Sequence, residues 1–457
     1  KELRDDPDID AIMWIGYPGA YGFYAVADVL NGTVSPSASL GDVFVSNNQA
    51  NPSMQSFGNI PWANASEFEA AENVNSYLVE AEGIYQGYRY YETRYNDIVN
   101  GNEDAKTAKA GTWTKDDSTI GTTNGTWNYT NEVTYPFGYG LSYTTFEEKL
   151  DSVTIDGNKK TALVKVTVTN TGDVAGKKSV QLYAQSPYTD YDKTNKVEKS
   201  SIQLMDFEKT KLLSKGESQT IEMHVDLQNI ASYDYTKAKT WILDNGTYTF
   251  SLGDNAHDAL NNILASQGKT TENGMDKNGN KDLTYSWTWD DFDTSTFAYS
   301  ETGKEITNQL TDGDYAMDLN AFKPNTVTYF SRSNWNETFP KSYEGLTADG
   351  RLKELLKNDF IQLKTDEDTS DIKFGDTTST LTLADLKGAS FDDPRYDELA
   401  NKVTVDEFLD FASNAFHNIQ KIESVGYSGN KADDGPGGSD THYLNEASYQ
   451  GQAFTDT

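Results

Sequence analysis

A short run near the C-terminal end of the chain combines a carboxylate with a stiff turn. Asp434 opens the sequence DGPGG, which ends at Gly438. Glycine and proline fix the direction of such a turn, and a carboxylate held in one direction can bind the hydroxyl groups of a ligand. The same residue types also dominate ordinary surface turns, so the residues alone leave a plain turn equally open. Asp434 is the candidate binding residue of the sequence.

A second run is rich in tyrosine. Glu82–Glu92 (EGIYQGYRYYE) places Arg89 and two carboxylates among four tyrosines. Aromatic rings suit the apolar faces of pyranose rings, so this run could be a sugar platform. The alternative is an arginine–carboxylate pair buried under a tyrosine cluster, and we favour it because perturbed ion pairs are often structural.

Two glycine-containing runs resemble ligand loops without matching them. Gly16–Gly22 (GYPGAYG) has the spacing G-x-x-G-x-x-G, which differs from the dinucleotide pattern and favours a tight turn. Asp276–Asp282 (DKNGNKD) alternates oxygen side chains, as a calcium loop does. However, its glycine is fourth instead of sixth, and Trp287 replaces the bidentate glutamate. An Asn-Gly hairpin turn is the favoured interpretation.

The histidines do not suggest a metal site. They share no ligand spacing, and they are His224, His257, His417 and His442. We therefore expect no metal, and no other cofactor is indicated.

The elements that must position these groups begin with a strand and a helix. Asp10–Gly16 (DAIMWIG) is a largely continuous apolar run, which predicts a strand buried on both faces. The next run predicts a helix that Gly32 ends, from the spacing of Phe23, Val26, Ala27 and Leu30. One such unit cannot make a sheet, so we expect its partners before Lys1 or on another chain.

The middle of the chain alternates with a period of two. Val164, Val166 and Val168 alternate with polar residues, and an Asn-Thr-Gly-Asp turn follows. The same period recurs at Val180 and Leu182, at Ile221, Met223 and Val225, and at Tyr248, Phe250 and Leu252. Short half-buried strands separated by turns predict a β-sandwich of the immunoglobulin or fibronectin kind.

Later, Thr404 and Glu407 form a capping-box pattern that predicts the start of a helix. The predicted domains are a partial α/β domain (1–100), a linker (101–133), the sandwich (134–260), an irregular connecting segment (261–400) and a new α-containing domain (401–457).

Composition excludes several classes of function. A chain of 457 residues is long enough for two or three domains. Its 38 basic and 71 acidic residues give a net charge of -33, which would repel a nucleic acid or an anionic membrane surface. It has no cysteine, and no apolar run is long enough for membrane insertion. The composition fits a secreted or cell-surface bacterial protein, and a cytoplasmic location is compatible with it.

Five stretches together resemble glycoside hydrolase family 3, the β-glucosidase and β-xylosidase family. They are DAIMWIGYPGAYGFYAVADVLNGTVSPSASL, YLVEAEGIYQGYRYYET, TYPFGYGLSYTTFE, the sandwich run VKVTVTNTGDVAGKKSVQLY with LMDFEKTKLLSKGESQTIEM, and ESVGYSGNKADDGPGG. Their order resembles the reversed-order subgroup of the family, in which YFSRSNWNETFP has a counterpart in the connecting segment. The resemblance implies part of an α/β sandwich domain, a fibronectin type III-like sandwich and the start of a (β/α)8-type barrel.

The resemblance also implies that the protein is a retaining, exo-acting β-glycosidase. Among such enzymes, a β-glucosidase is the expected one. The substrate would be an oligosaccharide or β-glucoside. In the family an aspartate on the barrel is the nucleophile and a glutamate of the α/β domain is the acid/base. Neither is expected in this chain, because Ser439-Asp440 lies too close to the DGP turn and Glu82 does not match the acid/base position. Only Asp434 carries over, as the aspartate that binds hydroxyls of the terminal sugar.

The missing groups would come from the rest of the same enzyme or from a companion chain, and a homo-oligomer is also compatible with the sequence. The alternative is a non-catalytic carbohydrate-binding or surface-assembly scaffold derived from the family. The resemblance places Thr134–Glu147, with its five aromatic rings, at the junction leading into the sandwich. We expect this run to be a joint packed between domains instead of a binding platform.

Overall fold

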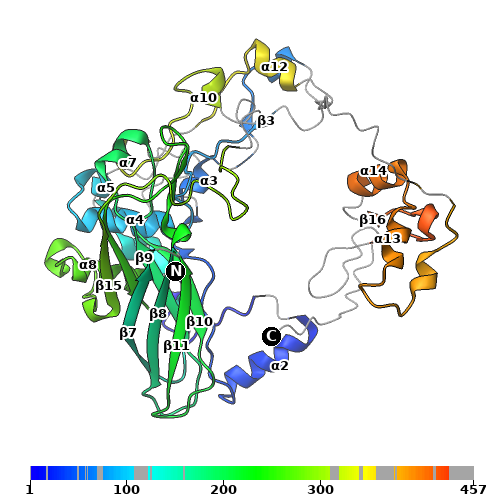
Figure 1. Ribbon diagram of the computed structural model, residues 1–457. Helices are drawn as coiled ribbons and strands as arrows, with labels where there is room; N and C mark the ends of the chain where they lie inside the picture. The colour runs from blue at the N-terminus through cyan, green and yellow to red at the C-terminus, as the bar shows by residue number, and fades with distance from the viewer. Residues whose placement is uncertain are drawn as a thin grey trace. The chain divides into compact units, whose positions relative to one another are not determined.

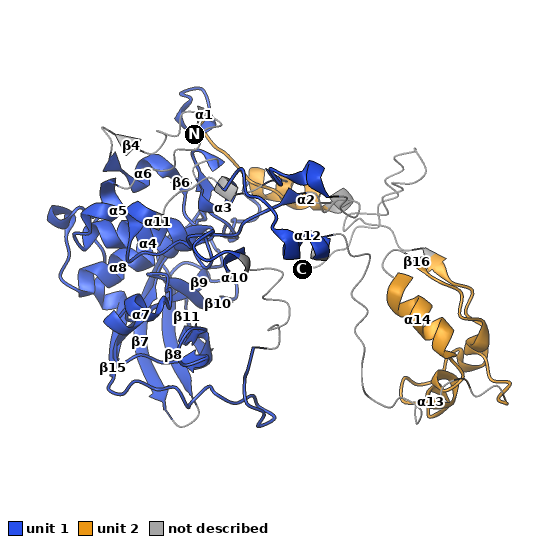
Figure 2. Cartoon of the chain, turned by 90° about the horizontal axis from the view of Figure 1, so that it is seen from above, with its two compact units in different colours: residues 1–9, 32–360 blue, residues 10–31, 361–457 orange. Residues whose placement is uncertain are grey.

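The computed structural model describes residues 2–16, 19–48, 51–56, 58, 60–68, 76–107, 122–123, 126–157, 160–308, 319–338, 343–356, 375, 378–414 and 418–431. The chain divides into two compact units. Unit 1 comprises residues 1–9 and 32–360, and unit 2 comprises residues 10–31 and 361–457 (Figure 2). None of the helices described is long and apolar enough to cross a membrane.

Unit 1 contains the longest strands of the described residues. Its α-helices are α1 (Glu2–Asp5), α3 (Pro52–Ser56), α4 (Tyr88–Val99), α5 (Glu103–Thr107), α6 (Tyr129–Glu132), α7 (Asp190–Asn195), α8 (Ala256–Ser266), α10 (Leu319–Phe322), α11 (Trp335–Thr338) and α12 (Gly350–Leu356). Its 3-10 helices are η2 (Ala65–Glu67), η3 (Leu227–Ile230), η4 (Thr271–Asn273) and η5 (Lys281–Leu283).

The long strands of unit 1 are β7 (Phe146–Asp156), β8 (Thr161–Asn170), β9 (Ser179–Gln185), β10 (Gln203–Lys209), β11 (Ser218–Asp226), β14 (Gly246–Leu252) and β15 (Thr284–Trp289). The short strands are β1 (Phe44–Val45), β2 (Ile60–Pro61), β3 (Ser76–Tyr77), β4 (Thr122–Thr123), β5 (Thr126–Trp127), β6 (Val133–Tyr135), β12 (Ser232–Asp234) and β13 (Thr240–Ile242). The short strands pair two by two, as β1 with β6, β2 with β3, β4 with β5 and β12 with β13.

The long strands form a β-sandwich (Figure 1). One antiparallel sheet has the order β11-β8-β7 and the other has the order β10-β9-β14-β15. On β8, Val164, Val166 and Val168 are fully buried and alternate with less buried residues, which confirms the predicted two-residue period. Ile221, Met223 and Val225 of β11 are buried in the same way.

The four-stranded sheet is covered on both faces. Leu182 of β9 belongs to the core between the two sheets, which we call the sandwich core. Its neighbour Tyr183 belongs to a second core built largely from α4 and α8, which we call the helical core. Because successive side chains of a strand point to opposite faces, β9 separates the two cores. The sequence predicted strands buried on one face only, and the helices of the second core explain the difference.

The run Thr134–Glu147 connects these two cores. Phe137 packs on the helical core and stacks on Tyr88 of α4, with ring centroids 4.3 Å apart. Phe146, at the start of β7, packs on the sandwich core. Between them Gly138 has a φ of 83°, and a Cβ there would lie 2.1 Å from Oε1 of Gln181. This run therefore connects the two cores within unit 1, and its predicted role as a joint between domains stays a prediction.

Part of the predicted linker is packed structure. Ala105 of α5, Trp127 of β5 and Tyr129 of α6 are all buried in the helical core. These apolar side chains lie outside any periodic pattern in the sequence, which is why the composition of 101–133 suggested a bare linker. The boundaries of the predicted domains remain predictions.

Unit 2 contains α2 (Gly19–Leu30), the helix that the sequence predicted, and Gly32 with a φ of 79° follows its end. The strand predicted over Asp10–Gly16 was wrong. These residues have no regular secondary structure, and Ile12, Met13 and Ile15 are 51%, 41% and 41% exposed. A strand needs a neighbouring strand to pair with its backbone, and no described residue pairs with this one.

The C-terminal part of unit 2 has a small core of its own, made by Leu386, Leu399 and Val425. Its elements are η6 (Leu383–Leu386), α13 (Arg395–Ala400), α14 (Val405–Asn414), β16 (Asn418–Ile419), η7 (Glu423–Val425) and β17 (Asn430–Lys431). The predicted capping box is confirmed. The Thr404 amide donates to Oε2 of Glu407 at 2.9 Å, and the Glu407 amide donates to Oγ1 of Thr404 at 3.2 Å.

Candidate functional site

The tyrosine-rich run that the sequence singled out leads into α4, the most buried helix of unit 1. The helix begins after Gly87, whose φ is 53°, and nine of its twelve residues are buried. They include three charged side chains, Glu92, Arg94 and Asp97, and the amide side chain of Asn96 is buried beside them. Buried charges need partners, so the contacts of α4 decide what this region can do.

The first polar cluster centres on a histidine between two carboxylates. His257 of α8 lies with Nδ1 2.8 Å from Oε2 of Glu92 and with Nε2 2.9 Å from Oδ2 of Asp276. The Tyr129 hydroxyl donates to Oε1 of Glu92 at 2.5 Å, and its ring stacks on the imidazole with centroids 3.8 Å apart. The Tyr95 hydroxyl contacts Oδ1 of Asp276 at 2.9 Å.

This arrangement favours the protonated form of the histidine. Burial disfavours a charged ring, but Glu92 and Asp276 outweigh it and raise the pKa of His257 to about 9. Burial also acts against the charge of Asp276. There the contacts with His257, Tyr95 and Asn261 prevail and lower the pKa of Asp276 to about 2. His257 is therefore held as an imidazolium at neutral pH.

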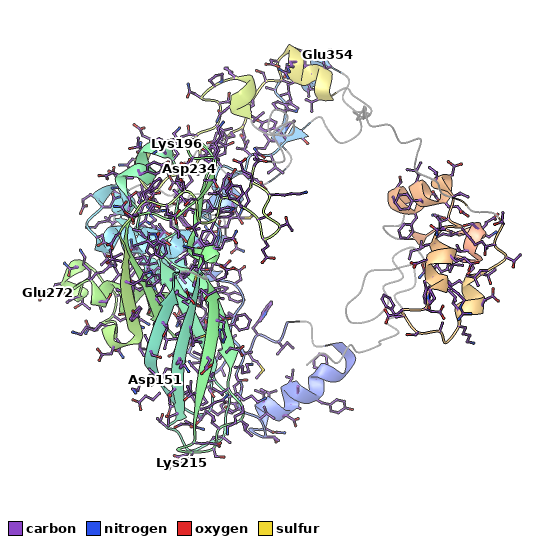
Figure 3. All side chains as sticks on the ribbon, viewed as in Figure 1. Asp151, Lys196, Lys215, Asp234, Glu272 and Glu354 are labelled. Carbon is purple, nitrogen blue, oxygen red and sulfur yellow. The ribbon has the colours of Figure 1, made fainter. Side chains whose placement is uncertain are left out.

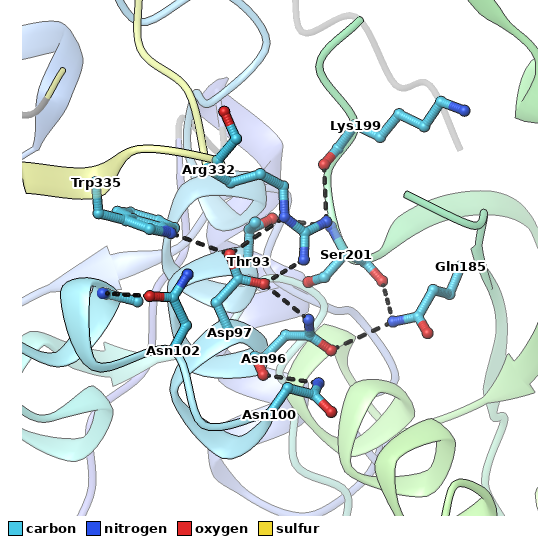
Figure 4. Close-up of polar contacts among 12 residues, drawn as sticks. Thr93, Asn96, Asp97, Asn100, Asn102, Gln185, Lys199, Ser201, Arg332 and Trp335 are labelled. Carbon is cyan, nitrogen blue, oxygen red and sulfur yellow. Dashed lines mark hydrogen bonds and ion pairs between the residues drawn. The ribbon is translucent and has the colours of Figure 1, made fainter. Parts of the chain in front are cut away.

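The second cluster joins the end of α4 to the connecting segment (Figure 4). Arg332 forms an ion pair with Asp97 through Nη2 and donates from Nε to Oδ2 of Asp97 at 3.2 Å. Trp335 donates from Nε1 to the same oxygen at 3.0 Å, and Arg332 donates from Nη1 to the Lys199 carbonyl at 3.1 Å. Burial opposes the charge of Arg332, but Asp97 outweighs it and the pKa of the guanidinium is raised.

Glu198 ties the same segments together a short distance away. Its Oε2 accepts from the Tyr85 hydroxyl at 2.5 Å, and its Oε1 accepts from the Ser331 hydroxyl at 2.5 Å. Phe330 adds a backbone bond by donating to the Ala81 carbonyl at 2.7 Å. These contacts bind the YFSRSNW run onto α4 and onto the loop before β10. Sequence reasoning missed Arg332 and Glu198, although the mixture of arginine and aromatic residues in YFSRSNW was a usable signal.

These clusters are suited to holding the fold, not to binding a sugar. Glu92 is fully buried and bonded to Tyr129 and His257, so it has no side open to a ligand. The predicted buried carboxylate beneath tyrosines is present, but its predicted partner was wrong. Arg89 is exposed, and His257 takes its place. Glu82 is also buried, and its Oε2 receives no hydrogen bond from the described residues.

The DKNGNKD run is neither a hairpin nor arranged as a calcium loop. Asp276 turns inward to His257, and η5 begins within the run at Lys281. Gly279 lies against α8, where a Cβ would be 2.0 Å from the Asn261 carbonyl oxygen. The hairpin prediction was wrong because no strand precedes the turn, and the loop packs on a helix instead. In the described part of the chain, no group of three or more His, Asp or Glu residues could hold a metal ion.

The residue predicted to bind a sugar is Asp434, in the DGPGG run. Asp434 lies outside the described residues, and so does the Ser439-Asp440 pair. Among the charged side chains of unit 1, Lys215 and Glu272 are exposed on its outside (Figure 3).

Comparison with known proteins finds relatives over part of the chain. Residues 178–256 match the fibronectin type III-like domain family. Beta-glucosidase A of Butyrivibrio fibrisolvens is 31% identical over 56% of this chain and 26% of its own length, and a beta-glucosidase of Ruminococcus albus is 32% identical over 56% and 21%. An exo-alpha-(1->6)-L-arabinopyranosidase of Bifidobacterium longum is 30% identical over 55% and 26%. The chain therefore matches about a quarter of the length of these curated relatives.

Among solved structures, a GH3 beta-glucosidase of Bifidobacterium adolescentis matches 66% of this chain and 32% of its own, at 25% identity and a TM-score of 0.39. The matched fibronectin type III-like residues cover part of the sandwich, from just before β9 to just after β14, and leave β7, β8 and β15 outside the match. With this domain near its centre and these relatives along more than half of its length, the chain is similar to beta-glucosidases, which supports its resemblance to glycoside hydrolase family 3.

Proposed function

We propose that this chain is part of a retaining, exo-acting β-glycosidase, and that its substrates are oligosaccharides or β-glucosides with a terminal β-D-glucosyl residue. The observation that carries the proposal is the match of more than half of the chain to two bacterial beta-glucosidases at 31% and 32% identity. The fibronectin type III-like domain between residues 178 and 256 supports it. No cofactor is required by this chemistry.

Retaining hydrolysis needs two carboxyl groups about 5–5.5 Å apart, one ionised as nucleophile and one protonated as acid. The carboxylates of α4 are poor candidates for either role, because Glu92 is bonded to His257 and Asp97 is bonded to Arg332. We therefore place the nucleophile and the acid/base in the remaining part of the same enzyme or in a companion chain. In this proposal the present chain supplies the start of the barrel, part of the α/β domain and the sandwich.

Asp434 is proposed to bind hydroxyl groups of the terminal sugar. In the assembled enzyme, Asp434→Ala should raise KM and lower kcat/KM for an aryl β-D-glucoside by about 100-fold, since a lost charged hydrogen bond costs roughly 3 kcal/mol. Asp433→Ala is the matched control, because it removes the neighbouring carboxylate and keeps the turn. Equal kinetics in the two variants would contradict the role given to Asp434.

The activity itself is tested with the purified 457-residue chain and with the complete enzyme or assembly that contains it. The chain alone should not hydrolyse aryl β-D-glucosides. The complete enzyme should, and proton NMR should show β-glucose as the first product anomer. Turnover by the chain alone would contradict the placement of the carboxylates. Binding of β-glucosides by the complete protein without turnover would instead support a carbohydrate-binding scaffold.

The sugar preference is tested in the same assay. An aryl α-L-arabinopyranoside is the comparison substrate, because one relative is an exo-alpha-(1->6)-L-arabinopyranosidase. We expect a higher kcat/KM for the β-D-glucoside. A secreted or cell-surface location is proposed from the acidic, cysteine-free composition.

A further inference from the structure

A lysine of the sandwich is buried between two aspartates. Lys199 lies in the loop between α7 and β10, and its side chain is 5% exposed. Asp192 is on α7 and Asp244 lies just before β14, and both side chains are fully buried. Lys199 Nζ contacts Oδ2 of Asp244 and lies 3.1 Å from Oδ1 of Asp192. The three groups therefore meet in a place that water does not reach.

The surrounding bonds hold both carboxyl groups in position. Thr189 donates from Oγ1 to Oδ1 of Asp244 at 3.1 Å, and its amide donates to Oδ2 of Asp192 at 2.7 Å. The Tyr248 hydroxyl donates to the Asp244 carbonyl at 3.0 Å, which fixes the backbone there. Asp192 Oδ1 faces Lys199 Nζ at 3.1 Å and accepts no other hydrogen bond from the described residues. This oxygen is available for proton transfer.

The charges in this cluster are unfavourable as they stand. One ammonium and two carboxylates would leave a net negative charge in a buried site, and each buried ion carries a desolvation penalty. Burial raises the pKa of Asp192 against the opposing effect of Lys199, so the charged form of this carboxyl group is less favoured than in water. A reaction that removes one ammonium and one carboxylate would relieve the cost of burying that pair.

We propose that Lys199 and Asp244 condense after folding to an intramolecular isopeptide bond, with Asp192 as the carboxyl group that transfers the protons. The Lys199 ammonium first gives one proton to the Asp244 carboxylate that it contacts. The resulting amine nitrogen then attacks Cγ of Asp244, the new C–N bond forms, and one C–O bond of the carboxyl group breaks. Asp192 gives a proton to the departing oxygen and takes one from the nitrogen, so it ends as it began. The ammonium and the carboxylate become one amide and one water molecule, and no oxidant or co-reactant is consumed.

Contact and exclusion of water are the two conditions that favour this step. Holding the reacting groups together removes most of the entropy cost of bringing them together, and a dry site favours the uncharged amine and acid. The chain contains a comparison in Lys178, which forms ion pairs with Glu148 and Asp254. Its side chain is 17% exposed and that of Asp254 is 69% exposed, so water reaches this pair. We expect Lys178 to remain a free amine.

The test is the intact mass of the purified chain under denaturing conditions. The proposal expects a mass lower than that of the sequence by one water molecule. Trypsin should leave Lys199 uncut and release residues 197–209 joined to residues 240–269 as one branched peptide. A water lost within a single peptide, as in an aspartimide, would not give this product.

Variants locate the reaction and keep the test independent of folding defects. Lys199→Arg keeps the charge but cannot condense under these conditions, so its mass should equal that of its sequence, whereas Lys178→Arg should still lack one water. Asp192→Asn should leave most of the chain uncondensed. A wild-type mass equal to that of the sequence would overturn the proposal, and so would loss of water by Lys199→Arg.

Discussion

Individual buried charges of unit 1 are balanced by groups from distant parts of the chain. Glu92 and His257 are 165 residues apart in the sequence, and Asp97 and Arg332 are 235 apart. Each pair lies in a region from which water is largely excluded, so each charge depends on its partner. The stability of the fold at a given pH should reflect these pairs.

Because of His257, the free energy of unfolding should depend on pH between about pH 6.5 and pH 9. Its pKa is raised to about 9 in the folded protein, against an ordinary value of about 6.5 in the unfolded chain. The stabilisation is therefore complete below about pH 6.5 and is lost as the pH rises through 9. A shift of this size corresponds to on the order of 3 kcal/mol. Urea unfolding of the wild type and of His257→Gln between pH 6 and 10 should show their difference shrinking with rising pH.

His224 provides the control, because it is exposed on β11. His224→Gln should follow the wild-type curve at every pH. A constant difference between wild type and His257→Gln over the whole range would show that the ring is not protonated in the fold.

Removing only one partner of the ion pair between Asp97 and Arg332 should greatly lower the free energy of unfolding. Arg332→Met leaves Asp97 buried with one ion partner fewer, so we expect a loss of about 3–5 kcal/mol in urea unfolding. The double variant Asp97→Asn with Arg332→Met should lose clearly less than the sum of the single losses, because no unpaired charge remains. Additive losses would show that the two side chains do not interact in the folded protein.

At the scale of elements, the joint between the two cores should be sensitive to the size of one ring. Phe137→Ala removes the ring that stacks on Tyr88 of α4, so we expect a loss of about 2 kcal/mol, less than for a fully buried phenylalanine. Hydrogen exchange should then quicken in α4 before it quickens in β8. Leu141 in the same run is 71% exposed, and Leu141→Ala should change stability by less than about 0.5 kcal/mol.

The loop that packs on α8 should not tolerate a methyl group. In Gly279→Ala the new Cβ would lie 2.0 Å from the Asn261 carbonyl oxygen, so the loop must move away and we expect a loss of about 1–3 kcal/mol. Gly41→Ala is the control, since nothing lies within 4 Å of its Cβ position. Thermal unfolding of both variants compares them directly, and equal melting temperatures would contradict the close packing.

Local patterns predicted the strands and helices that carry a clear period. Val164, Val166 and Val168 alternate with polar residues, and the structure buries them as expected. The prediction of a strand at Asp10–Gly16 was wrong, because a strand needs a neighbouring strand to pair with and no local pattern describes that neighbour. The prediction of a hairpin turn at DKNGNKD was wrong, because Asp276 is oriented by His257, which lies on a helix earlier in the chain. The polar clusters are formed by side chains from segments that are distant in the sequence, and a single sequence gives little indication of which residues pair.

At the scale of the whole molecule, the net charge of -33 should destabilise the folded protein at low ionic strength. Raising sodium chloride from about 0.01 M to about 0.15 M shortens the Debye length from about 30 Å to about 8 Å. We expect the melting temperature to rise over this range because repulsion between carboxylates is screened. Potassium chloride should give the same rise, and a falling melting temperature would contradict the explanation.

The sheet formed by β10, β9, β14 and β15 is shared by both cores, because Leu182 packs in the sandwich core and Tyr183 packs in the helical core. If the sandwich were produced without α4 and α8, the face of this sheet that carries Tyr183 would be exposed to water. Anyone who wishes to produce the sandwich by itself should therefore keep α4 and α8 with it, because the isolated domain would be prone to aggregate through the uncovered face.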